Sequence, residues 1–138
     1  MKRDPLAILA RLERQELDNR RGDLVAARGA VAHLTAAVAR HEADWREAMT
    51  LATTAEAELD LWGAASRGIR QVVDRVDRER ATQLRVLGEA QAAVHASLVE
   101  LKRLEVLAER RAARRAAAAA TAETRALDEL ATLRHGRR

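Results

Sequence analysis

The chain has 138 residues, of which 48% are hydrophobic but only 1% aromatic, and it contains no cysteine. The lack of cysteine excludes a disulfide framework, a thiol nucleophile and every metal site with cysteine ligands. With 33% charged residues and abundant alanine, leucine, arginine and glutamate, the composition favours long helices over a thick globular core. The net charge of +4 comes from the C-terminal segment, because residues 102–138 hold ten basic and five acidic side chains, whereas residues 1–101 hold 15 and 16.

The first predicted element is a helix over about residues 5–61. It starts at Asp4 and Pro5, because an aspartate side chain caps unpaired N–H groups and proline is well suited to the first helical position. Leu6, Leu9 and Leu12 are expected to begin its apolar stripe. A heptad repeat follows, with core positions at Leu17, Leu24, Val31, Val38, Trp45, Ala52 and Leu59, and between them at Arg20, Ala27, Leu34, His41, Ala48, Ala55 and Trp62.

The next predicted feature is a reversal of the chain over about residues 62–68. Gly63, Ser66 and Gly68 cluster there, close to the middle of the sequence. Because glycine and serine are typical of turns, we expect the chain to double back once at this point.

A second helix is predicted over about residues 69–135, with Gly136 as its end. Its apolar stripe begins with Ile69, Val72, Val73 and Val76, loosens at Arg80 and Gln83, resumes through Leu84, Leu87, Val94, Leu98, Leu101, Leu104 and Ala108, and closes with Leu127, Leu130 and Leu133. Two such helices fold most simply as an all-α, antiparallel coiled-coil hairpin, a single domain over 1–138. In this hairpin Leu24, Val31 and Val38 are expected to face residues 87–108.

We expect no catalytic, cofactor-binding or metal site, and therefore no enzyme, because a pair of helices offers no enclosed pocket. The four histidines do not have a metal-ligand spacing; they are His33, His41, His95 and His135. His41 falls on a core position, where a polar residue commonly sets the register. Trp45 is interpreted as a core residue, and Trp62 either closes the turn or anchors a partner.

The chain is expected to have no membrane span, because no run approaches about 18 consecutive apolar residues. Its N-terminus also lacks the apolar core and cleavage site of a signal peptide. We therefore expect a cytoplasmic protein.

A basic cluster precedes the alanine-rich run of the second helix, and it comprises Arg110, Arg111, Arg114 and Arg115. It is open to three interpretations: a solvated flank of the coiled coil, a contact with an acidic protein surface, or a contact with nucleic acid phosphates. The chain lacks the aromatic residues that stack on bases, and Glu123, Asp128 and Glu129 follow in the same segment. These features disfavour nucleic acid as the partner.

The C-terminal residues resemble the ending of the flagellar type III export protein FliJ family, whose pattern runs approximately E-Q-K-x-x-D-E-x-A-x-x-R. Glu123, Asp128, Glu129, Ala131 and Arg134 match this pattern, and Arg125 stands in place of its lysine. The family stretch L-x-x-L-x-E-R-R has its counterpart in Leu104, Leu107, Glu109, Arg110 and Arg111. After the reversal, Ile69, Val72, Val73 and Val76 keep the apolar spacing of the family motif Y-x-x-F-L-x-x-L but lose both aromatic residues.

This resemblance implies a monomeric stalk of the flagellar protein export apparatus at the cytoplasmic face of the inner membrane. The stalk would insert its paired ends into the pore of a hexameric export ATPase, stimulate it, and contact the export gate and export chaperones. The ATPase-facing residues would be Arg110, Arg111, Arg114, Arg115, Glu123, Asp128, Glu129 and Arg134. The gate-facing residues would be the exposed parts of Ile69, Val72, Val73 and Val76. No nucleic acid partner is expected.

Three alternatives remain open from the sequence. The chain is similar also to the YscO-like stalk proteins of injectisomes, which share the architecture. An arginine-rich coiled coil that binds nucleic acid is the second alternative. The third is a homodimeric scaffold in which the chain does not turn and two extended copies pair.

Overall fold

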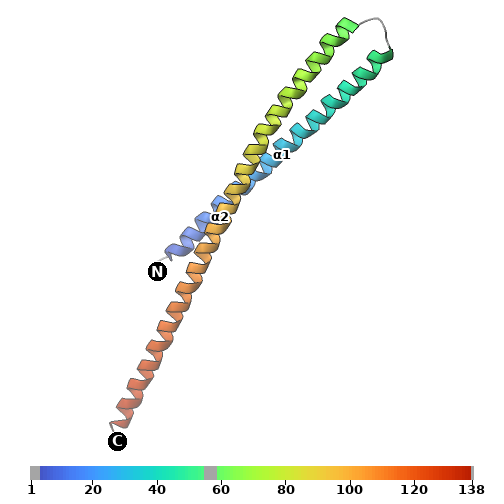
Figure 1. Ribbon diagram of the computed structural model, residues 1–138. Coiled ribbons are helices and arrows are strands. Elements are labelled where there is room, and N and C mark those ends of the chain that lie inside the picture. Colours follow the sequence, from blue (N-terminus) through green and yellow to red (C-terminus); the bar gives the residue numbers. More distant parts are fainter. Residues whose placement is uncertain (1–3, 55–58, 138) are drawn as a thin grey trace. The chain divides into compact units, whose positions relative to one another are not determined.

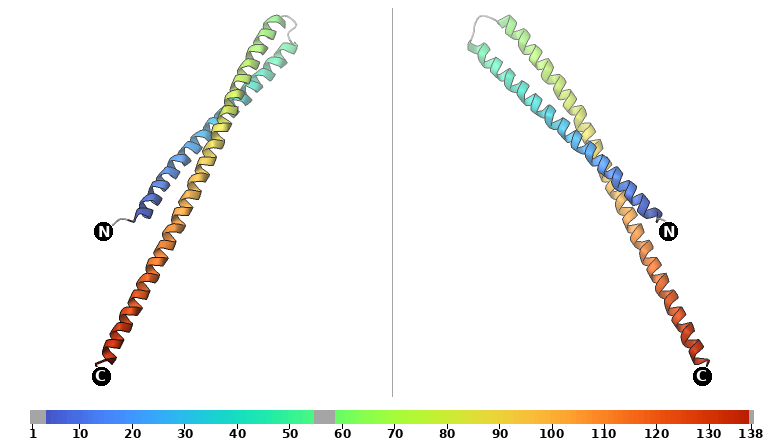
Figure 2. Two further views of the ribbon diagram at one scale, coloured as in Figure 1. Left: turned by 60° about the vertical axis from the view of Figure 1, so that its left-hand side comes forward. Right: turned by 180° about the vertical axis from the view of Figure 1, so that it is seen from behind.

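The computed structural model describes the backbone of residues 4–54 and 59–137 and the side chains of residues 4–51 and 63–137. Helix α1 spans Pro5–Thr54 and helix α2 spans Leu59–His135, and the described residues include no strand. The two helices pack against each other and run in opposite directions (Figures 1 and 2). The predicted all-α, antiparallel hairpin is therefore confirmed.

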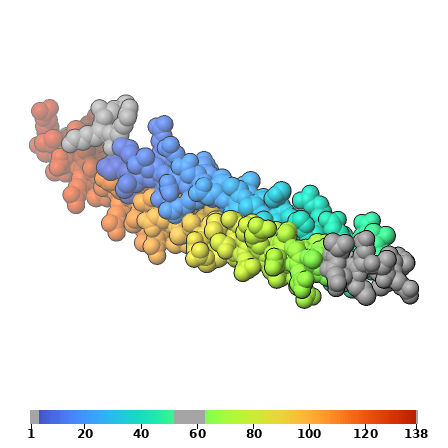
Figure 3. Space-filling model, turned by 90° about the horizontal axis from the view of Figure 1, so that it is seen from above, coloured from blue at the N-terminus to red at the C-terminus, as the bar shows by residue number. Residues whose placement is uncertain are grey.

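The chain divides into two compact units, each of which contains part of both helices. Unit 1 comprises Met1–Glu16 and Ser97–Arg138, and unit 2 comprises Leu17–Ala96. In unit 2 the side chains of α1 lie directly against those of α2 (Figure 3). The single coiled-coil domain over 1–138 stays a prediction.

The start of α1 is capped as the sequence predicts. The Asp4 side chain accepts a hydrogen bond from the Leu6 amide at 3.2 Å, and the Asp4 carbonyl oxygen accepts one from the Ile8 amide, also at 3.2 Å. Pro5 occupies the first helical position. The first bond satisfies an amide that has no carbonyl partner within the helix, and the second is the first regular backbone bond of α1.

The positions at which α1 and α2 cover each other, here called the seam, follow the predicted heptad along α1. Leu17, Ala27 and Val38 are buried. The remaining described heptad positions are half-buried: Arg20, Leu24, Val31, Leu34, His41, Trp45 and Ala48. The side chains of Ala52, Ala55, Leu59 and Trp62 lie outside the described residues. The described part of the predicted heptad is therefore confirmed.

The predicted N-terminal extension of this stripe is wrong at two of its three positions. Leu9 is 48% exposed and Leu12 is 57% exposed, whereas Ala10 is buried. Leu6 is half-buried, as predicted. A step of three residues turns by less than a full helical turn, so leucines spaced by three drift off the contact face. Ala10 stays on that face because it lies one heptad before Leu17.

The reversal predicted over 62–68 is also wrong, because α2 begins at Leu59 and continues as a helix through Gly63, Ser66 and Gly68. None of the described glycines has a positive φ. The Ser66 hydroxyl donates to the Gly63 carbonyl oxygen at 3.1 Å, so that serine is satisfied within the helix. A glycine in a helix costs only about 1 kcal/mol relative to alanine, and packing against α1 offsets such a cost. Helix α1 ends at Thr54 rather than near residue 61.

The earlier start of α2 shifts the pairing along the seam. Within unit 2, Arg20, Ala27 and Ala30 of α1 line one hollow together with Gln83 and Ala93 of α2. Residues 20–30 therefore face residues 83–93, at lower numbers in α2 than a reversal at 62–68 would place there. Leu24, Val31 and Val38 were predicted to face residues 87–108. The register of that prediction is wrong, because residues 20–30, which include Leu24, face residues 83–93.

The end of α2 agrees with the sequence. The helix ends at His135, and the Gly136 amide donates to the Thr132 carbonyl oxygen at 3.0 Å. Arg134 and His135 lie in the last turn, where a basic residue interacts favourably with the helix dipole.

Candidate functional site

The C-terminal end of α2 differs from the rest of the chain because nothing covers it among the described residues. Every residue from 109 to 137 is exposed. Within unit 1, α2 continues past the N-terminal end of α1 (Figures 1 and 2). We call residues 112–137 the C-terminal arm. Its helix depends on intrinsic propensity, which is high for the alanines of 116–120.

Four of the five arginines predicted to face the ATPase, Arg110, Arg111, Arg114 and Arg115, lie at the base of this arm and are all exposed. One of them, Arg111, bridges the two helices of unit 1, because its guanidinium group donates to the Asp4 carboxylate at 3.2 Å. The same carboxylate oxygen caps α1. Arg111 thus fixes the N-terminal end of α1 against α2, and the structure gives it an intramolecular role that the sequence did not predict.

The remaining predicted ATPase-facing residues are Glu123, Asp128, Glu129 and Arg134, and all of them are exposed along the arm. Leu127, Leu130 and Leu133, predicted to close the seam, are 60%, 57% and 66% exposed. That prediction is wrong because α1 begins at Pro5, next to Asp4, and Asp4 pairs with Arg111. The described part of α1 therefore ends beside Arg111 and does not reach these leucines. The arm therefore combines charged side chains with uncovered leucines.

The residues predicted to face the export gate have a different placement. Ile69, Val72, Val73 and Val76 lie on α2 in unit 2, and all four are half-buried. Val73 lines a hollow together with Trp45 of α1. This placement favours their interpretation as seam residues that pack against α1.

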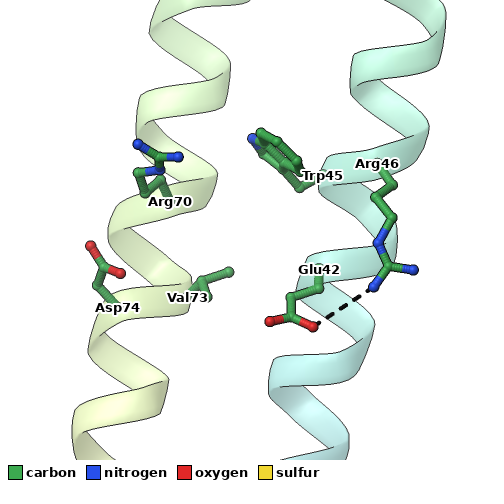
Figure 4. Close-up of a pocket in the computed structure, with 6 residues that line it drawn as sticks. All are labelled: Glu42, Trp45, Arg46, Arg70, Val73 and Asp74. Atoms are coloured by element: carbon green, nitrogen blue, oxygen red, sulfur yellow. Dashed lines mark ion pairs between the residues drawn. The ribbon is translucent and has the colours of Figure 1, made fainter.

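The hollow beside Trp45 has a volume of about 380 Å³ and lies between the helices of unit 2. Its walls are Glu42, Trp45 and Arg46 of α1 and Arg70, Val73 and Asp74 of α2. Figure 4 shows Trp45 pointing from α1 toward α2, while Glu42 and Arg46 form an ion pair at 3.8 Å. Trp45 is half-buried, which agrees with its prediction as a core residue, but the hollow was not predicted.

The second tryptophan and the four histidines were also singled out in the sequence. The Trp62 side chain, interpreted as a plug or an anchor, lies outside the described residues. His41 is half-buried at its seam position, and the other three histidines are exposed. In the part of the chain that the structure describes, no three histidine, aspartate or glutamate side chains are grouped so that they could hold a metal ion. In the same part, neither helix has a stretch apolar enough to cross a membrane.

Comparisons of the chain with protein-family models, with curated proteins and with solved structures found no match. The resemblance to the FliJ family therefore rests on the C-terminal residues quoted above.

Proposed function

We propose that the chain is a stalk of the flagellar type III protein export apparatus. It inserts into the hexameric export ATPase, stimulates it, and links it to the export gate and export chaperones. The observation that carries this proposal is that the residues resembling the FliJ family lie on the exposed C-terminal arm and at its base. A surface that acts on a partner has to be accessible, and all of these residues except the half-buried Leu104 are exposed.

The charge pattern of the arm supports the same proposal. Arg114 and Arg115 precede Glu123, Asp128 and Glu129, and Arg134 follows them, so the arm offers both signs of charge to a surrounding ring. Exposed charges guide association and orientation more than they increase affinity. A stalk that contacts several ATPase subunits in turn needs this kind of weak, distributed contact.

Contact with the export gate is the second part of this function. It is assigned to the exposed edges of the half-buried Ile69, Val72, Val73 and Val76, whose main packing is against α1. A location at the cytoplasmic face of the inner membrane follows only from the proposed partners.

The test is to add the purified chain to the cognate export ATPase and to measure ATP turnover and ring assembly. We expect both to increase, and the double variant Arg114→Glu/Arg115→Glu to lose most of the increase because it reverses the charge at the base of the arm. The matched control is Arg67→Glu/Arg75→Glu, two exposed arginines of α2 in unit 2, which should stimulate like the natural chain. No change in turnover or assembly with the natural chain would remove the stalk proposal.

A further inference from the structure

The side of α2 that faces away from α1 in unit 1 carries a shallow apolar hollow. It is lined by Val99, Lys102, Arg103, Val106, Leu107 and Arg110. These residues are spaced by three and four, so they share one face of the helix. The seam face holds Leu101, Leu104 and Ala108 instead, all of them half-buried. The hollow is therefore a second apolar surface, which α1 does not cover.

Its apolar residues are partly accessible. Val99 is 38% exposed and Leu107 is 48% exposed, and Val106 between them is half-buried. Single exposed apolar residues are normal on a protein surface, but a contiguous group with a polar rim is typical of an interaction site.

Exposed apolar residues of α1 extend this surface. Ile8, Leu9 and Leu12 are 45%, 48% and 57% exposed. Leu9 directly precedes the seam residue Ala10, and Leu107 directly precedes the seam residue Ala108. In an antiparallel pair of helices, residues that directly precede contact positions on each helix lie along the same flank.

The two flanks of unit 1 are closed in different ways. Arg14 and Glu105, each of which lies four residues after a seam position, form an ion pair at 3.7 Å across the opposite flank. On the flank of Leu9 and Leu107, the equivalent places hold these two exposed leucines together with the exposed Glu16 and Glu100. An apolar surface thus extends from α1 onto the outer face of α2 on one side of the unit only.

We propose that this surface binds an amphipathic helix of a partner protein, whose apolar stripe is flanked by aspartate or glutamate. The apolar side chains of the partner would cover Val99, Val106 and Leu107, in the manner of a helix that lies in a groove. Its acidic flank would face Lys102, Arg103 and Arg110, which form the basic rim of the hollow. The inference does not rest on the proposed stalk function, although Arg110 belongs to both proposed surfaces.

The charges favour this occupant over a second copy of the chain. A symmetric dimer through this face would place the same patch on both sides and bring its basic rims together. Lys102 and Arg103 form ion pairs with Glu105 and Glu100 at 3.7 and 3.5 Å, but both basic side chains are more than two thirds exposed. Such exposed pairs are weak, so a partner carboxylate can replace them.

The experiment uses the full chain and two fluorescent helical peptides that share one leucine stripe and differ only in glutamate or lysine flanks. Fluorescence anisotropy measures their affinities. We expect the glutamate peptide to bind at least about tenfold more tightly than the lysine peptide, and its binding to weaken as salt rises from about 50 to about 500 mM. The variant Leu107→Glu should weaken binding of the glutamate peptide by at least about tenfold.

The matched control is Leu127→Glu, an exposed leucine of the same helix outside the patch, which should bind like the natural chain. In addition, Arg110→Glu should weaken the glutamate peptide and strengthen the lysine peptide. Circular dichroism checks that each variant keeps its helix content, which exposed substitutions by glutamate should preserve. Equal affinity for both peptides, no binding of either, or unchanged binding by Leu107→Glu would overturn the proposal. A dimer in light scattering that Leu107→Glu dissociates would overturn it in favour of a second copy.

Discussion

Arg20 shows how a charged residue is accommodated at a seam position. Its side chain is half-buried, and its guanidinium group donates to the Ala93 carbonyl oxygen of α2 at 3.1 Å. The aliphatic part of an arginine side chain packs on apolar neighbours while the charged end reaches a polar partner. Arg20 and Ala93 line one hollow between the two helices, together with Ala27.

Substitution of Arg20 by alanine should lower the free energy of unfolding by about 1–2 kcal/mol, because it removes a charge-assisted hydrogen bond between the helices and the packing of the side-chain stem. The matched control is Arg21→Ala. Arg21 is exposed and pairs only on its own helix with Asp18 at 3.7 Å, so its loss should change stability by less than about 0.5 kcal/mol. Urea unfolding followed by circular dichroism measures both. Equal losses in the two variants would contradict an interhelical role for Arg20.

The elements differ in how far the sequence could predict them. The heptad of α1 was predictable over 17–48, because burial along a seam repeats every seven residues. The reversal was not, because Gly63 and Gly68 are typical of turns and also tolerated in helices. Whether these glycines form a turn or continue a helix depends on the helical residues around them and on the packing of α2 against α1. The local sequence does not show which residues of α1 and α2 pack together.

Gly68 allows this difference to be tested. Since it lies inside α2 without a positive φ, and nothing lies within 4 Å of an added Cβ, Gly68→Ala should stabilise the chain by about 0.5–1 kcal/mol. Gly136→Ala is the control, because Gly136 lies beyond the end of α2 and should give no comparable gain. Thermal unfolding measures both variants. A loss of stability in Gly68→Ala would instead indicate a turn at 62–68.

The C-terminal arm is an element held by helix propensity rather than by packing. Ala118→Pro should therefore reduce the helix content and leave the unfolding of the hairpin, followed by tryptophan fluorescence, within about 0.5 kcal/mol of the natural chain. The arm contains no tryptophan, so the fluorescence reports on Trp45 and Trp62. Ala90→Pro, at a half-buried seam position, should cost about 3 kcal/mol or more. Equal losses in the two variants would show that the arm is packed.

For the molecule as a whole, the sequence predicted the two helices better than it predicted which of their side chains are covered. The basic cluster was correctly expected at the surface of α2, but the pairing of Arg111 with Asp4 depends on the register of two segments far apart in the chain. The hollow beside Trp45 likewise depends on how α1 pairs with α2 within unit 2. A heptad pattern shows which face of each helix is covered, but it does not show which residues of the two helices lie opposite each other.

The final prediction separates a hairpin of one chain from two extended chains that pair. Both sides of the seam come from the same chain, as in the bond from Arg20 to Ala93, so dilution cannot separate them. The unfolding midpoint should therefore not change across about a hundredfold range of protein concentration. Pairing of two chains would instead make apparent stability rise with concentration, by about 2.7 kcal/mol over that range. Thermal unfolding at several concentrations measures this. A midpoint that rises with concentration would contradict the hairpin, and with it the intramolecular bridges from α1 to α2 on which the proposed stalk depends.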